Sequence, residues 1–147
     1  MTLKQTTVLL SRIALFVIYF WFGFLKIIGM SPASTLVQDL FNHPIIHPFF
    51  AFTPFITPHV FVIVFGVFEV IIGILFIIPG KEKWASTLFY LHMFTTFLPL
   101  FLLKGLWQGF LAPTLEGQYI IKNLALIACA LTVLQAGKEA QIKPLVV

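Results

Sequence analysis

The sequence predicts an all-α membrane protein, an up-down bundle of four transmembrane helices, and three observations lead to this fold class. The 147-residue chain is 60% hydrophobic and only 10% charged, whereas charged residues make up about a quarter of a soluble domain. Four apolar runs approach or reach the roughly 20 residues that a helix needs to span hydrocarbon. The link between the second and third runs is a short turn, which favours antiparallel neighbours. We expect a single integral membrane domain over residues 1–147.

The expected helices lie at about residues 8–28, 60–78, 84–103 and 119–136, with the turn at residues 79–83. With an even number of crossings, both termini and this turn share one side of the membrane. That side carries Lys4, Arg12, Lys81, Lys83, Lys138 and Lys143, against Lys26, Lys104 and Lys122 on the other. The positive-inside rule therefore predicts that both termini are cytoplasmic.

Composition also excludes several classes of function. The net charge of +4 does not indicate nucleic acid binding, because the basic residues lie at the ends of apolar runs and form no patch. Cys129 is the single cysteine and lies inside an apolar run. The chain therefore has no internal disulfide and no dithiol redox pair of its own.

The first helix carries Arg12, Phe16, Tyr19, Gly23 and Lys26 at alternating spacings of four and three, which places them on one seam facing the bundle. We expect Arg12, near a membrane boundary, to extend its charge to water. Lys26 leans back into the membrane, because side chains tilt toward the helix N-terminus. We therefore predict that Lys26 meets Glu69, across a difference in Cα level of roughly 12 Å.

The second helix has a carboxylate, Glu69, near its centre. A charge at mid-membrane costs about 2.5 to 3.5 kcal/mol on insertion scales, so such a residue indicates a functional site. Gly66 and Gly73 lie one turn either side of it, on the face where small residues let a neighbouring helix approach closely. The sequence thus predicts a polar centre beside a tight helix contact.

The outer segment from Gly29 to His59 lies between the first two helices. Residues 33–41 set Leu36, Val37, Leu40 and Phe41 against Gln38 and Asp39, as expected of a short amphipathic helix on the membrane surface. The remainder is an irregular loop rich in proline and phenylalanine, which we expect to cap the bundle mouth. His43 and His47 have a metal-ligand spacing, but Pro44 and Pro48 break the helix that would pair them, so no metal site is expected.

The third helix contributes His92, Thr95, Thr96 and Pro99. His92 and Thr95, one turn apart, could line the same interior face as Glu69. The alternative is that His92 is a packed, neutral imidazole bonded to a neighbouring helix. We expect Thr95 and Thr96 to bond to carbonyls that Pro99 leaves free.

The outer loop from Lys104 to Gln118 leads into the fourth helix. Trp107 is expected to anchor this loop at the membrane interface. Glu116 is delivered to the bundle mouth near Lys122 and Asn123, although Glu116 and Lys122 could equally be an exposed ion pair of little worth. The small and polar seam of the fourth helix is predicted to face inward. It comprises Lys122, Ala125, Cys129, Thr132 and Ala136.

Three stretches, taken in order, resemble the DoxX-like family of membrane proteins, with its DoxD-like and YkgB-related neighbours. They are Ser11-Arg12 leading to WFGFLK at 21–26, GVFEVIIGIL at 66–75, and EGQYIIKNL at 116–124. The resemblance implies a four-helix bundle in the bacterial inner membrane, and family members are linked to a quinone-reducing thiosulfate oxidoreductase and to oxidative-stress assemblies. The wider group is also similar to eukaryotic membrane chaperones and cargo receptors. The Pro- and Phe-rich outer segment matches none of these motifs.

Three functions remain open from the sequence. One is a redox-linked or stress-linked membrane subunit whose polar pocket holds a quinone or other small ligand. The second is an accessory or assembly protein without catalysis, in which Lys26 and Glu69 fix helix register. The third is a small permeation unit for protons or a solute, gated by Glu69. No haem, flavin or metal motif is present. An enzyme acting alone is not indicated, because the sequence shows no nucleophile with an oriented base, no metal set and no phosphate loop.

The candidate pocket residues are Lys26, Glu69, His92, Glu116, Lys122 and Asn123. The residues expected to support them are Arg12, Tyr19, Trp21, Gly66, Gly73, Thr95 and Thr96. Expected partners are the lipid bilayer, other membrane or redox subunits, and further copies of the chain.

Overall fold

A computed structural model of the chain describes residues 2–53 and 55–142. Its elements in order are α1 (Leu3–Ile27), α2 (Ala33–Phe41), α3 (His47–Ala51), α4 (Pro58–Ile77), α5 (Glu82–Leu102), the 3-10 helix η1 (Lys104–Leu106), β1 (Trp107–Gly109), β2 (Ala112–Pro113) and α6 (Leu115–Ile142).

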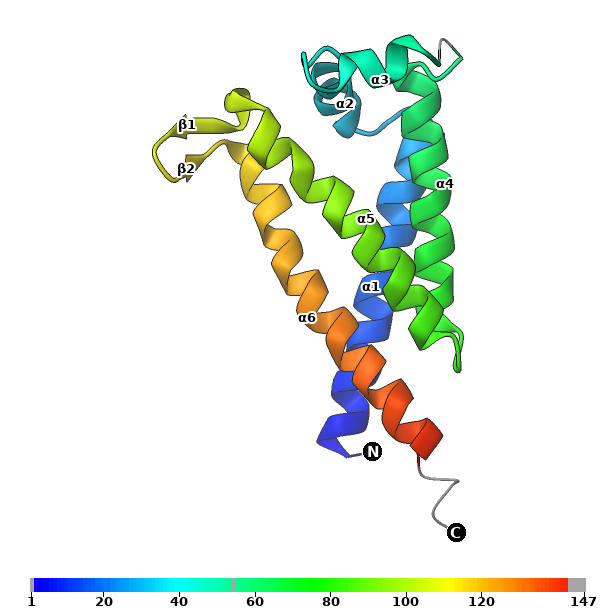
Figure 1. The fold of residues 1–147 in the computed structure, drawn as a ribbon. Helices are drawn as coiled ribbons and strands as arrows, with labels where there is room; N and C mark the ends of the chain where they lie inside the picture. Colours follow the sequence, from blue (N-terminus) through cyan, green and yellow to red (C-terminus); the bar gives the residue numbers. More distant parts are fainter. Residues whose placement is uncertain (1, 54, 143–147) are drawn as a thin grey trace.

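Helices α1, α4, α5 and α6 run up and down through the molecule, and the start of α1 and the end of α6 lie at the same end of the bundle (Figure 1). Each of the four is long and apolar enough to cross a membrane. The predicted four-helix bundle is therefore confirmed. Helix α6 exceeds its predicted range of 119–136 at both ends, because polar residues such as Gln118 and Glu139 continue the helix where the hydropathy signal stops.

Helices α1 and α4 pack through glycines, as predicted for Gly66 and Gly73. A Cβ atom built on Gly66 would lie 2.6 Å from the carbonyl oxygen of Gly23, and one built on Gly23 would lie 2.6 Å from the carbonyl oxygen of Gly66. A Cβ on Gly73 would lie 3.0 Å from the backbone nitrogen of Phe20. The backbones of α1 and α4 therefore come so close at these positions that only glycine, which has no side chain, fits there.

The core is formed by all four long helices. Its buried members are Leu15, Tyr19, Ile72, Phe76, Ala85, Phe89, Met93, Ala130 and Val133. Apolar side chains on the opposite faces, such as Val17, Val64 and Leu131, are exposed on the protein surface. An apolar outer surface on every long helix is what contact with lipid requires.

The outer segment covers the end of α4 (Figure 1). Helix α2 has the predicted range, and Phe41 is its buried residue. The Phe41 ring stacks on Phe50 of α3 at 3.8 Å between centroids and meets Phe61 of α4 edge-on at 5.4 Å. The phenylalanines of this cap therefore pack on one another and hold the segment against the bundle. The segment contains the short helix α3, with Pro48 in its first turn, where an irregular loop was predicted.

The loop between α5 and α6 is more ordered than the sequence indicates. It contains η1 and a two-stranded antiparallel hairpin in which Trp107 faces Pro113. The Trp107 Nε1 donates to the backbone oxygen of Leu100 at 2.9 Å, which fixes the indole to the end of α5. Strands this short carry too few residues to show the alternation that predicts a strand.

The predicted inner face of α6 is wrong. Lys122 and Ala125 are exposed, and Cys129 is half-buried. The buried residues are Gly117, Ile120, Ala130, Val133 and Gly137. The polar residues of α6 do not gather on one side of the helix, so polarity does not mark its inner face. The glycines mark it instead, since a Cβ on Gly137 would lie 2.9 Å from Glu82.

Candidate functional site

Glu69 lies inside the bundle with a partner on each carboxylate oxygen. Lys26 Nζ from α1 donates to Glu69 Oε2 at 2.6 Å. His92 Nε2 from α5 lies 2.9 Å from Glu69 Oε1. The side chains of Glu69 and His92 are 8% and 4% exposed, and that of Lys26 is 12% exposed. The predicted meeting of Lys26 and Glu69 is thus present in the structure.

The close contact between α1 and α4 positions this ion pair. Gly23 lies against the backbone of α4, where its added Cβ would come within 3.0 Å of Glu69 Cβ. Lys26 follows one turn later, so its stem crosses Gly66, whose own added Cβ would lie 2.7 Å from Lys26 Cβ. Lys26 therefore lies level with Gly66, one helical turn or roughly 5 Å from the level of Glu69. The difference of roughly 12 Å expected from the sequence is wrong.

His92 extends the chain of polar contacts to a third group. Its Nδ1 atom lies 3.1 Å from the hydroxyl of Tyr19 and 3.3 Å from Thr96 Oγ1. The tautomer with its proton on Nε2 satisfies both sides of the ring: Nε2–H donates to Glu69 and Nδ1 accepts from Tyr19. The Phe65 ring stacks on the imidazole, with centroids 4.6 Å apart.

Lys26, Glu69, His92 and Tyr19 are hereafter called the polar centre. They come from three helices, α1, α4 and α5, and Glu69, His92 and Tyr19 are buried. His92 therefore lies in the interior beside Glu69, as predicted. It also bonds to neighbouring helices, through Tyr19 of α1 and Glu69 of α4. Tyr19, expected only to support the site, belongs to the chain of contacts itself.

The two threonines of α5 bond to a different carbonyl group from the one expected. Thr95 and Thr96 donate to the backbone oxygen of His92 at 2.7 and 2.9 Å, and not to the carbonyl of Thr95 that Pro99 leaves without its usual donor. Thr95 is exposed, so it does not line the interior. A hydroxyl reaches a carbonyl three or four residues earlier on its own helix, which is the contact that both residues make.

A second ion pair lies nearer the chain ends and was not foreseen. Arg12 Nη2 pairs with Glu82 Oε1, and Arg12 Nη1 donates to the backbone oxygen of Phe76 at 2.8 Å. Glu82 also accepts from the backbone nitrogen of Gly80 at 3.0 Å. Arg12 therefore points into the protein, with its side chain 16% exposed, and does not extend to water as predicted.

The reason for this error is the position of Glu82. The sequence assigns it to an exposed turn, whereas it is the first residue of α5 and is 6% exposed. A signal was available: Arg12 and Glu82 stand near the starts of the first and third long helices, which begin on the same side of the bundle, and they have opposite charges.

Several predicted site residues are not brought to the polar centre. Lys122 is exposed, and its Nζ lies over the ring of Tyr119, 5.1 Å from the centroid. Glu116 is exposed and Asn123 half-buried near the start of α6. Trp21 is 58% exposed on the outer side of α1. Among the described residues, the structure therefore brings together Lys26, Glu69 and His92 of the predicted pocket, but not Glu116, Lys122 or Asn123.

Two buried hydroxyl groups have no hydrogen-bond partner among residues 2–53 and 55–142. They are Ser86 Oγ and Tyr90 OH, both on α5 between the two ion pairs. Within the same ranges, no group of three histidine, cysteine, aspartate or glutamate side chains is placed to hold a metal ion. The carboxylate, imidazole, phenol and ammonium groups of the polar centre are all able to bind or release a proton.

No family model, curated protein or solved structure matches the chain.

Proposed function

We propose that this multi-pass membrane protein is a redox-linked subunit of the DoxX-like kind, in which the polar centre holds and passes on a proton. The observation that carries the proposal is His92, which links the hydroxyl of Tyr19 to the carboxylate of Glu69. Ionisable side chains inside a membrane are costly and usually serve a proton or ion path. Lys26 connects this path to the outer end of α1.

A quinone-class ligand suits this arrangement chemically. Reduction of a quinone to a quinol consumes protons, and the Lys26 end of the polar centre is its most exposed part. Lys26 supplies further N–H donors for a carbonyl oxygen, since an ammonium group has three and one is given to Glu69. The excess of basic residues at the end that holds the chain termini supports cytoplasmic termini. The bacterial inner membrane is the location that the resemblance to DoxX-like proteins implies.

Infrared difference spectroscopy on the protein in liposomes tests the proton-binding step. Acidification should produce a protonated-carboxyl band that Glu69→Gln removes and that Glu69→Asp shifts. Asp39→Asn, a change at an exposed carboxylate of α2, is the matched control and should leave the band in place. A spectrum with no titrating buried carboxyl contradicts the proposal.

Quinone binding is tested separately, by organic extraction of the purified protein and by titration with a soluble quinone. Spectral changes in the polar-centre bands should accompany binding. Absence of both extracted quinone and spectral response removes the quinone while leaving the proton-binding step to its own test.

A second candidate, an assembly protein whose polar centre only fixes helix register, is favoured by one specific observation. Both oxygens of Glu69 and the ammonium of Lys26 are already paired within the protein. Under this function, Lys26→Glu combined with Glu69→Lys restores the folded yield that each single change lowers. Restored yield together with an unchanged cellular role would favour register over proton chemistry.

We do not propose that the protein conducts a solute through its interior. Leu15, Phe76 and Phe89 are fully buried and belong to the packed core. By their positions in α1, α4 and α5, they separate the polar centre from the Arg12–Glu82 pair. An apolar, close-packed layer at this level closes the interior to a continuous solute path.

A further inference from the structure

The first three turns of α1 and the last turns of α6 enclose a hollow that the polar centre does not share. It has a volume of about 540 Å³, and Thr2, Lys4, Gln5, Val8, Leu9, Arg12, Ala136, Glu139 and Ala140 line it. A second hollow of about 370 Å³ adjoins it around Lys4, Val8 and Ala136. The first volume falls within the range of roughly 300 to 1,000 Å³ typical of ligand sites. We call this hollow the terminal groove.

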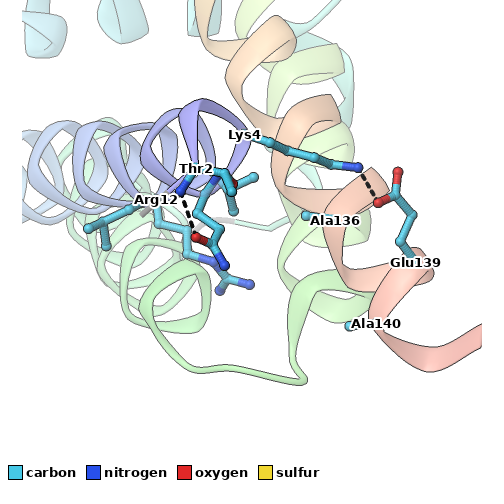
Figure 2. A pocket seen from close by; sticks show the side chains of 9 residues that line it. Thr2, Lys4, Arg12, Ala136, Glu139 and Ala140 are labelled. Atoms are coloured by element: carbon cyan, nitrogen blue, oxygen red, sulfur yellow. Dashed lines mark hydrogen bonds and ion pairs between the residues drawn. The ribbon is translucent and has the colours of Figure 1, made fainter. Parts of the chain in front are cut away.

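The terminal groove is polar at one end and apolar along its walls. Figure 2 shows Lys4 on α1 reaching across to Glu139 on α6, with which it forms an ion pair. Arg12 stands about 12 Å further along α1 by helix rise, but its side chain tilts back toward the helix N-terminus. The walls between these charges are Val8, Leu9, Ala136 and Ala140.

Donor capacity remains at both basic groups. Lys4 has three N–H donors and gives one contact to Glu139, while the guanidinium of Arg12 has five and makes contacts to Phe76 and Glu82. The end of the molecule around the groove is also basic. Its charged side chains among the described residues are Lys4, Arg12, Lys81, Lys83 and Lys138 against Glu82 and Glu139.

The apolar walls of the groove reach the outer surface of α1 and α6. Leu9 is 45% exposed, and Ala140 is exposed on α6. Both helices are candidate membrane spans. A ligand that enters here from the side must therefore bring an apolar part alongside its charged part.

We infer that the terminal groove binds an anionic phospholipid of the surrounding leaflet. Its phosphate lies between Lys4 and Arg12, and the start of an acyl chain lies along Val8, Leu9, Ala136 and Ala140. Basic pockets between membrane helices on the cytoplasmic side are suited to such headgroups. The alanines of α6 provide the room, since larger side chains at 136 and 140 would fill the space between the helices.

Native mass spectrometry of the full chain tests this site, with phosphatidylglycerol and phosphatidylcholine of identical acyl chains as probes. Phosphatidylglycerol should be retained in preference to phosphatidylcholine. Ala136→Leu with Ala140→Leu should lower its retention about fivefold, because leucines that fill the groove keep the phosphate from reaching Lys4, a contact worth about 1 kcal/mol near the surface. Ala125→Leu with Ala128→Leu is the matched control, because both alanines are exposed on α6 outside the groove and should leave retention unchanged.

Lys4→Glu keeps the test decisive if the filled groove impairs folding, because the Lys4 side chain is 63% exposed and tolerates exchange. This variant should lose the preference for phosphatidylglycerol. Equal retention in the filled, control and charge-reversed variants overturns the inference. Displacement of the lipid by soluble glycerol phosphate at matched concentration also overturns it, since the groove would then be a site for a free phosphate.

Discussion

Glu69 and Lys26 contribute unequally to the ion pair that they form. The Glu69 carboxylate is buried at mid-helix, whereas Lys26 stands one residue before the end of α1, where a long side chain can reach water. Loss of the cation therefore leaves a buried charge with His92 as its remaining partner. Loss of the anion leaves a cation with a route out of the membrane.

We expect Lys26→Met to lower the free energy of unfolding by about 3 to 5 kcal/mol, the cost of breaking a buried pair from one side. Glu69→Gln, which keeps the shape of the side chain, should cost less. Reversible unfolding in mixed micelles measures both, with Lys104→Met at an exposed site as control. A larger loss for Glu69→Gln than for Lys26→Met would contradict this order.

Replacement of Ser86 should stabilise the folded protein, whereas the changes at Lys26 and Glu69 destabilise it. Its hydroxyl is buried and has no partner in the described part of the chain, and such a group costs about 1 to 3 kcal/mol to bury. Ser86→Ala should therefore raise the midpoint of thermal unfolding, whereas Thr87→Ala, which removes an exposed hydroxyl bonded to the Lys83 carbonyl, should leave it nearly unchanged. A lower midpoint for Ser86→Ala would mean that the hydroxyl is paired in the membrane.

The sequence predicted site residues well where a charge interrupts an apolar run. Glu69 and Lys26 stand out for this reason, and antiparallel geometry brings them together. It predicted poorly at helix ends, where Glu82 looks like an ordinary turn residue although the fold buries it against Arg12. The involvement of Tyr19 depends on its distance to His92, and spacing along one helix cannot give that distance.

The contact between helices α1 and α4 depends on glycine. Substitution of Gly66 places a methyl group 2.6 Å from the backbone oxygen of Gly23, which is a rigid neighbour. The helices must move apart, and this separation also stretches the Lys26–Glu69 contact one turn away.

Gly66→Ala should accordingly lower folded yield, measured by fluorescence-detected size exclusion, at a cost of about 1 to 3 kcal/mol typical of overpacking. Gly105→Ala is the matched control, since nothing lies within 4 Å of a Cβ at that position. Normal yield of the Gly66 variant would show that α1 and α4 are further apart than the structure has them.

The existence and order of the long helices could be predicted because hydropathy and length decide both. The inner face of α6 could not be predicted, because its polar residues are spread around the helix and tertiary packing decides which face is buried. The hairpin between α5 and α6 was missed for a different reason: Leu111, at positive φ, gives no turn signal of the kind that glycine or asparagine provides.

At the scale of the whole molecule, the up-down order places the turn at residues 79–83 on the same side as both chain ends (Figure 1). In a Cys129→Ala background, cysteines placed at Gln5 and Lys83 should react with an impermeant thiol reagent from the same side of sealed vesicles. A cysteine at Gln108 in the hairpin should react from the opposite side. Labelling of Lys83 and Gln108 positions from one side would contradict the four-crossing bundle.

The two ion pairs of α1 have a consequence for how the chain is made. Arg12 and Lys26 leave the ribosome before Glu69 and Glu82, the anions that neutralise them in the finished protein. The first span thus enters the bilayer carrying uncompensated cations, and its anions arrive only with the second and third spans. Although α1 is synthesised first, its final depth and rotation are settled only once most of the polypeptide has emerged.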